Sequence, residues 1–110
     1  MAAAERNPDV PGASVPEGAL AREAAESLAR TFRAVSDPTR LQILSYIVSS
    51  PGERAVVRDL AEFLGLRQPT VSHHLSVMAE DGIVVRERGG RHSWYSIAPE
   101  RQEAIRDLLS

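Results

Sequence analysis

The sequence contains no cysteine among its 110 residues. A chain without thiols cannot form disulfides, bind metals through thiolates, use a cysteine nucleophile or sense redox state by thiol chemistry. It also lacks any apolar stretch of about 18 residues, the length that a membrane-spanning helix needs. The start of the chain has neither the basic residues nor the apolar core of a signal peptide, which favours a cytoplasmic protein without a membrane partner.

Lysine is absent as well. All 13 basic residues are arginine, and they nearly balance 15 acidic residues, so the net charge is −2. A balanced charge exerts no global attraction on nucleic acid, and any such binding must depend on a local basic patch. Arginine suits phosphate and guanine recognition, but GC-rich codon usage explains the bias better because alanine is abundant too.

The length corresponds to one ordinary domain, which is small for an enzyme with a deep cleft. Residues 1–16 contain three prolines and few large apolar side chains, so burial cannot offset the entropy lost on ordering. We therefore expect a disordered N-terminal tail over residues 1–16. Residues 17–110 are expected to form one folded domain.

Apolar residues recur at helical spacing in the first two thirds of this domain. A first helix is expected to begin near Ser14–Glu17 and to end at Ser36. Asp37 and Pro38 form a typical N-cap and first helical position, and the apolar stripe of this second helix is Leu41, Leu44, Ile47 and Val48. Two further helices are predicted at residues 57–64 and 68–80, the latter with Val71, Leu75 and Met78 on its inner face.

The helical spacing of the apolar residues ends at Gly82. Two β-prone runs, residues 83–88 and 92–97, flank Gly89, Gly90 and Arg91 and predict a hairpin, and Pro99 opens a last helix. The predicted fold class is therefore mainly α with a β-hairpin wing (α+β), a winged helix-turn-helix. The spacing of Ala61, Gly65 and Val71 supports a helix-turn-helix, although a generic three-helix bundle has similar core spacing.

The outer side of the helix at 68–80 is polar and carries no acid between residues 66 and 79. Polar side chains near the N-terminus of a helix can hydrogen-bond to base edges and phosphates in a major groove. Arginines at the hairpin suit a minor groove or its flanking phosphates, unless the tip is merely solvated. The candidate DNA-binding residues are Arg67, Gln68, Thr70, Ser72, His73, His74, Arg86, Arg88 and Arg91.

The first and last predicted helices offer more apolar surface than a small winged core can cover, which suggests a homodimer. The candidate interface residues are Leu20, Leu28, Phe32, Ile105, Leu108 and Leu109.

Four segments carry a family resemblance: residues 36–41 (SDPTRL), 59–61 (DLA), 68–75 (QPTVSHHL) and 81–84 (DGIV). Together they resemble the ArsR/SmtB family of winged-helix transcriptional regulators over about residues 28–97. The resemblance implies a homodimer through the first and last helices and a recognition helix in the major groove. It also implies repression of a nearby operon that is relieved when an effector, usually a metal ion, binds.

The sequence departs from the family at both common metal sites. Val56 and Arg58 stand where the resemblance places thiolates, and residues 100–110 contain no histidine for the site on the last helix. His73 and His74 are adjacent on a helix, point about 100° apart and do not readily chelate one ion. His92 is expected to face solvent or phosphate. The prediction is therefore a regulator with no cofactor and no recognisable metal site.

Alternatives to this hypothesis stay open. The chain could be a winged-helix module that binds a protein, a regulator that uses a non-standard carboxylate–histidine site for nickel or zinc, or one that relies on a sensing partner protein. Catalysis is disfavoured, because Ser72 beside His73 has no orienting acid nearby. The primary prediction is a non-enzymatic regulator that binds an inverted-repeat operator in double-stranded DNA. It is expected to act as a repressor.

Overall fold

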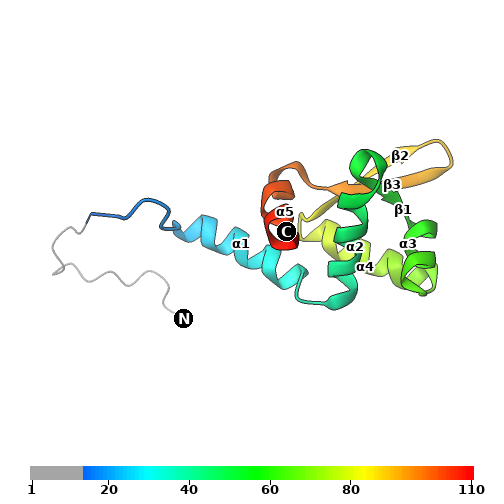
Figure 1. Cartoon of the computed structure of the whole chain (residues 1–110), viewed down its shortest axis with the longest axis horizontal. Helices are drawn as coiled ribbons and strands as arrows, with labels where there is room; N and C mark the ends of the chain where they lie inside the picture. The colour runs from blue at the N-terminus through cyan, green and yellow to red at the C-terminus, as the bar shows by residue number, and fades with distance from the viewer. Residues whose placement is uncertain (1–13) are drawn as a thin grey trace.

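The computed structural model describes residues 14–110, and the expected tail lies outside the described residues except for Ser14, Val15 and Pro16. The described part confirms the predicted fold class: helices and one small sheet form a winged helix-turn-helix (Figure 1). No helix in this part of the chain is long and apolar enough to cross a membrane. In chain order the elements are α1 (Arg22–Ala34), α2 (Pro38–Ser49), η1 (Pro51–Glu53), β1 (Arg54–Val56), α3 (Val57–Leu64), α4 (Gln68–Glu80), β2 (Val84–Gly89), β3 (His92–Ile97), η2 (Pro99–Arg101) and α5 (Gln102–Leu109).

Helix α1 begins later than the sequence predicts. A turn closes between Pro16 and Ala19, whose amide donates to the Pro16 carbonyl at 3.2 Å, and Gly18 takes φ +87° within it. A positive φ at the third position of a turn favours glycine and interrupts a helix. The helix therefore starts at Arg22, and Leu20 lies before it.

Helix α2 has the predicted cap, since the Thr39 amide donates to Asp37 Oδ1 at 2.8 Å. The predicted apolar stripe is partly wrong. Ile43 is buried with Leu44 and Ile47, whereas Leu41 in the first turn is exposed. The buried side of α2 therefore keeps Leu44 and Ile47 of the predicted stripe, adds Ile43 and loses Leu41, while Val48 is half-buried.

The helix-turn-helix consists of α3 and α4, and both have the predicted bounds. Gly65 ends α3 in the left-handed region with φ +67°, and the Leu66 amide donates back to the Ala61 carbonyl at 3.0 Å. This tight end lets α4 begin at Gln68. The inner side of α4 is fully buried, as predicted, through Val71, Leu75 and Met78.

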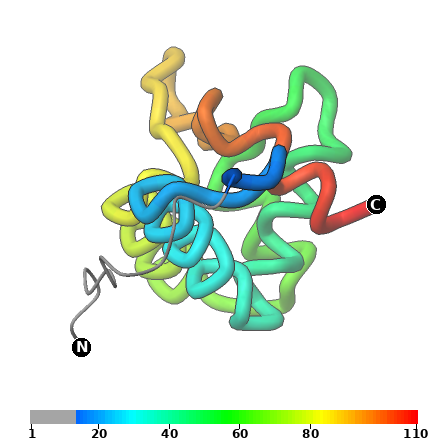
Figure 2. The backbone as a smooth tube through the Cα atoms, turned by 90° about the vertical axis from the view of Figure 1, so that its left-hand side faces the viewer, coloured from blue at the N-terminus to red at the C-terminus, as the bar shows by residue number. Residues whose placement is uncertain are grey.

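The hairpin is confirmed, but the sheet has a third strand that the sequence analysis did not predict. Strand order is β1-β3-β2, with both pairs antiparallel. Strand β1 pairs Ala55 with Tyr95, and β2 pairs Arg86 with the same tyrosine. The sheet thus connects the start of α3 to the hairpin, which projects from the body of the domain (Figures 1 and 2).

The C-terminal segment closes the fold against α1 and α2. Pro99 opens the turn η2 rather than the α-helix itself, which starts at Gln102. Arg101 donates to the carbonyl and hydroxyl of Ser27 in α1, at 3.2 and 2.5 Å. Figure 1 shows α1 extending away from the body, and Figure 2 shows it crossing in front of the other helices.

The turn at Gly65 gives a direct test of the helix-turn-helix geometry. A Cβ added at this position would have no atom within 4 Å, so the cost of Gly65→Ala is that of the left-handed backbone alone. We expect the free energy of unfolding to fall by about 1–2 kcal/mol. Gly65→Asn should cost less, because asparagine tolerates this conformation better. Urea unfolding followed by circular dichroism at one fixed protein concentration measures both variants, and equal stability of Gly65→Ala and the natural chain would contradict the assignment.

Candidate nucleic-acid interface

The polar residues on the outer side of α4 differ in how exposed they are. Arg67, Gln68 and Thr70 at the start of the helix and His73 one turn later are exposed, and Ser72 is half-buried. None of the large exposed apolar side chains of residues 14–110 lies on α4. With its inner side in the core, the helix therefore offers solvent a face of uncharged donors and acceptors over its first turns, with Arg67 at the N-terminal end and the exposed Glu80 at the C-terminal end.

His74 occupies a different place from the other predicted DNA-binding residues. It is half-buried, and its Nδ1 accepts a hydrogen bond from Nε of Arg40 at 3.1 Å. This bond joins α4 to the first turn of α2. The rings of His73 and His74 are tilted by 55°, with centroids 6.4 Å apart. His74 therefore positions α4 against α2 instead of extending freely from its outer face, and Arg40 is a contact that the sequence analysis missed.

The wing presents its arginines on the side that faces the domain. Side chains alternate along a strand, so Arg86 and Arg88 share a face with their cross-strand partners Tyr95 and Ser93. Tyr95 is buried and marks this face as the inner one. Nε of Arg86 donates to Ser93 Oγ at 2.9 Å, which fixes the direction of its side chain. Arg91, at the hairpin turn, is exposed.

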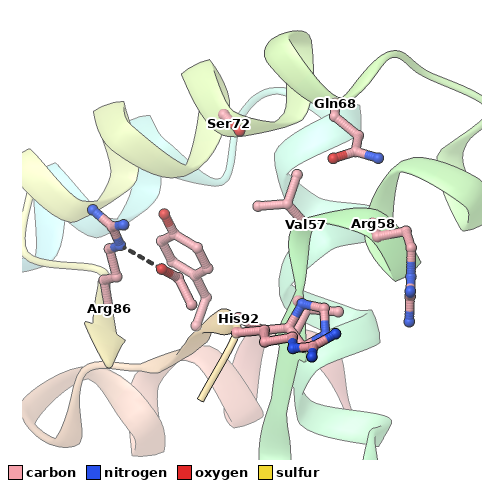
Figure 3. A pocket seen from close by; sticks show the side chains of 10 residues that line it. Val57, Arg58, Gln68, Ser72, Arg86 and His92 are labelled. Carbon is pink, nitrogen blue, oxygen red and sulfur yellow. Dashed lines mark hydrogen bonds between the residues drawn. The ribbon is translucent and has the colours of Figure 1, made fainter. Parts of the chain in front are cut away.

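A cleft of about 370 Å³ separates α4 from the wing. Gln68 and Ser72 line it from α4, Arg86 and His92 from the hairpin, and Arg58 from the start of α3 (Figure 3). No aspartate or glutamate lines it. The full lining is Val56, Val57, Arg58, Gln68, Ser72, Arg86, Arg91, His92, Ser93 and Tyr95.

Arg58 is the functional candidate that the sequence analysis did not single out. It is remote in sequence from the lining residues of the hairpin, and the pairing of β1 with β3 brings the start of α3 beside them. The signal for it was weak: a single arginine in the first turn of α3. On the outer face of the sheet, an arginine makes a cation–π contact instead of lining a cleft. Arg54 stacks over the ring of Trp94, with Cζ 4.0 Å from the ring centroid.

The residues at the family's thiolate positions do not fit a metal ion. Val56 is buried and has no ligand atom in its side chain, and Arg58 is cationic. Both line the basic cleft, where a cation would be repelled. Within residues 14–110 no three histidine, aspartate or glutamate side chains gather as a metal site would require.

The predicted dimer residues lie at the α1 and α5 side, with one exception. Leu20, Phe32 and Leu108 are exposed, at 58%, 47% and 41%, and Leu28 and Leu109 are half-buried. Ile105 is only 1% exposed, because it faces inward from α5 and belongs to the core of its own chain. Ile105 is therefore removed from the candidate interface.

Known proteins resemble this chain in both sequence and structure. The profile described as "Bacterial regulatory protein, arsR family" matches residues 37–85, which cover α2 through the start of the hairpin. The transcriptional regulator NmtR of Mycobacterium tuberculosis is 40% identical over 88 residues, 80% of this chain and 71% of that protein. A probable mercury resistance operon repressor of Streptomyces lividans is 41% identical over 84 residues, 76% of this chain and 62% of that protein.

Solved structures agree with these relatives. A predicted DNA-binding transcriptional regulator from E. coli superposes with a TM-score of 0.67 at 32% identity, covering 79% of this chain and 90% of the other. The homodimeric winged helix-turn-helix DNA-binding domain of Mb0332 from Mycobacterium bovis has a TM-score of 0.66 at 29% identity, with 84% of each chain covered. The chain therefore belongs to the arsR family of bacterial regulatory proteins and is a DNA-binding transcriptional regulator.

Proposed function

We propose that the chain is a repressor that binds an inverted-repeat operator as a homodimer, with α4 in the major groove and the wing on the flanking backbone. The observation that carries this proposal is the outer side of α4, free of acids over residues 68–79, next to a cleft lined by Arg58, Arg86 and Arg91. DNA requires positive charge close to the helix that enters its groove. In a chain with a net charge of −2, three arginines line this cleft and no acid does.

Base recognition is assigned to the start of α4. Gln68 is exposed at the first helical position and can pair with both N6 and N7 of adenine. Thr70 is exposed and has a methyl group for thymine, and Ser72 can donate to a base or a phosphate. Arg67, Arg88 and Arg91 are assigned to phosphates. His73 is exposed on the same face and is assigned to the backbone or the groove floor.

Dimerisation is assigned to α1 and α5, within one domain that spans residues 17–110. Phe32 and Leu108 leave large apolar surfaces exposed on these helices, and Leu28 and Leu109 extend them. The M. bovis relative is a homodimer with the same fold. A two-fold axis through this face would place the two α4 helices about 34 Å apart, one turn of DNA.

The opposite hypothesis, a winged helix that binds only protein, requires acidic or apolar residues on the outer side of α4. Between residues 68 and 79 the helix has no acidic residue and no large exposed apolar side chain; its one acid, Glu80, is the last residue. A sensing partner protein remains compatible with DNA binding, because it would act on the same regulator. It is therefore an addition to the proposed function rather than a competitor.

Substitutions in α4 should change base specificity, whereas substitutions in the wing should change only the overall affinity for DNA. Gln68→Ala is expected to weaken binding to the operator by about 1–3 kcal/mol and to flatten base preference. Arg88→Ala should weaken operator and scrambled duplexes alike and reduce the salt slope by about one per chain. Fluorescence anisotropy on an operator selected from random duplexes, at several salt concentrations, measures both. A change of preferred operator in Arg88→Ala would make the wing a base reader and refute the assignment.

A negative charge introduced on the apolar surface of α1 tests the proposed dimer interface. Phe32→Glu is expected to shift the chain from dimer to monomer at micromolar concentration, since a carboxylate is costly to bury in an apolar interface. Phe63→Glu is the matched control, because Phe63 is 52% exposed on α3, away from α1 and α5. Light scattering distinguishes the two. A monomeric natural chain that binds DNA one chain per site would overturn the homodimer.

Metal ions are expected to have little effect on DNA binding. A ligand that moves a complex from 99:1 to 1:99 must supply about 5.5 kcal/mol of differential binding, and no suitable ligand set is found in residues 14–110. Stoichiometric zinc, cobalt or nickel should therefore change operator affinity by less than about tenfold, or roughly 1.4 kcal/mol. An anisotropy titration with each metal and then a chelator tests this. A larger, saturable and chelator-reversible loss would show a metal site, with the acids of the outer helices and His92 as the first residues to replace.

A further inference from the structure

Two aromatic side chains stack on the surface where α2 meets α3. The rings of Tyr46 in α2 and Phe63 in α3 are tilted by 45°, with their centroids 5.0 Å apart. Phe63 is 52% exposed, which makes it the most exposed of the large apolar side chains in residues 22–110. Tyr46 is only half-buried beside it. The pair therefore leaves a patch of aromatic surface open to solvent.

The aromatic pair lines two hollows of different chemistry. One hollow, of about 310 Å³, is lined only by the two rings and by two carboxylates, those of Asp59 and Glu62. The other hollow, of about 420 Å³, is lined by the same rings together with Ser45, Ser49, Ser50 and Pro51. No basic side chain lines either hollow, and neither shares a residue with the basic cleft beside α4. The two hollows thus form a surface separate from the DNA-binding candidates.

The two carboxylates are only weakly neutralised within the chain. Oδ1 of Asp59 lies 3.6 Å from Nε of Arg58, but the two side chains are 47% and 64% exposed, and exposed pairs of this kind contribute little. Glu62 forms none of the ion pairs found within residues 14–110. It stands in the last turn of α3, where the helix dipole favours a cation and where no basic residue is present. A carboxylate that works against its local environment in this way is expected where a residue serves a binding site.

A cation with an apolar stem matches this surface. The faces of aromatic rings attract a guanidinium or ammonium group, and carboxylates beside the rings add charge-assisted hydrogen bonds. The stems of arginine and lysine also cover apolar surface. Both hollows are open on one side, so a small free cation would keep much of its surface in water, whereas a peptide segment can cross both. DNA does not match, because the carboxylates repel phosphate.

We propose that the acid-edged aromatic surface, formed by Tyr46, Asp59, Glu62 and Phe63, docks a segment of another protein that presents an arginine or lysine next to an apolar residue. The basic side chain lies over the rings between the two carboxylates, and the apolar residue enters the hollow beside Pro51. Figure 1 shows α3 at the end of the domain away from α1, so the surface is also remote from the proposed dimer interface. This docking requires neither operator DNA nor a metal ion and is therefore independent of the proposed function.

Selection from a random peptide library tests this docking. Phage that display short random peptides are selected on the natural full-length chain, and the same library is selected in parallel on Phe63→Ser. We expect only the natural chain to enrich peptides in which arginine or lysine stands next to a large apolar residue. Fluorescence anisotropy of the enriched peptides then gives their affinities. Binding should weaken as the salt concentration rises, because exposed charges are screened.

Variants of the surface separate its aromatic and acidic contributions. Phe63→Ser should lose about tenfold in peptide affinity, whereas Phe63→Trp should retain it, because tryptophan is the best aromatic partner of a cation. Glu62→Gln removes only the charge and should lose about threefold. The matched controls are Leu41→Ser and Glu80→Gln, an exposed apolar residue and an exposed acid outside both hollows, and they should bind unchanged. Circular dichroism and light scattering establish that each variant folds and keeps the oligomeric state of the natural chain.

Three results would overturn the proposal: no peptide enriched on the natural chain beyond Phe63→Ser, enriched peptides that are acidic, or equal peptide affinity for the natural chain and Phe63→Ser. Other occupants would give results of their own, and each would also refute docking of a partner protein. Association of natural oligomers into larger ones that Phe63→Ser abolishes would assign the surface to a second copy of the chain. Saturable binding of spermidine at constant ionic strength, tighter than that of any selected peptide and lost in Glu62→Gln, would assign it to a free organic cation.

Discussion

The burial of one side of α4 determines where the polar residues of this protein lie. Val71, Leu75 and Met78 are each fully buried, and removing one of them from the core would cost several kcal/mol. Because a helix turns by 100° per residue, fixing these three side chains inward forces Thr70 and His73 outward. Gln68 lies on the side of Val71 but is exposed at the first position of the helix. The direction of the outer side of α4 is thus a consequence of packing.

Backbone hydrogen bonds fix the wing relative to the packed helix α4. The Ile83 amide donates to the Met78 carbonyl at 2.8 Å, and the Ala98 amide donates to the Ile83 carbonyl at 2.9 Å. The base of the hairpin is therefore bonded to the end of α4 and to the start of η2. Pairing of β1 with β3 then places the beginning of α3 beside the hairpin. Arg58 and Arg86 reach one cleft through these backbone bonds, although neither touches the core of α4.

Local signals in the sequence were sufficient for most of the helices. The Asp37–Pro38 cap, Gly65 and the spacing of Val71, Leu75 and Met78 each act within one or two turns, so α3, α4 and the hairpin could be predicted closely. Strand β1 could not, because three residues carry too short a pattern and their partners lie 40 residues away. The start of α1 was misplaced because the turn at Gly18 outweighed the apolar spacing around Leu20.

The candidate site was predictable only where a single element presents it. The outer face of α4 and the wing arginines could be found from periodicity and charge. The cleft between them depends on tertiary contacts, and so do the contact between Arg40 and His74 and the inward direction of Ile105. Family resemblance located the helices that matter, but it implied thiolates at positions that here hold Val56 and Arg58.

We propose that α4 and the wing contact DNA as one surface, repeated by a two-fold axis. Ethylation interference with the natural chain on its selected operator tests this directly, since an ethylated phosphate blocks binding only where the protein contacts it. The account predicts, in each half-site, blocked phosphates beside the major groove occupied by α4 and a second group towards the wing, related by two-fold symmetry. Interference confined to one half-site, or to the groove edges with none towards the wing, would contradict it.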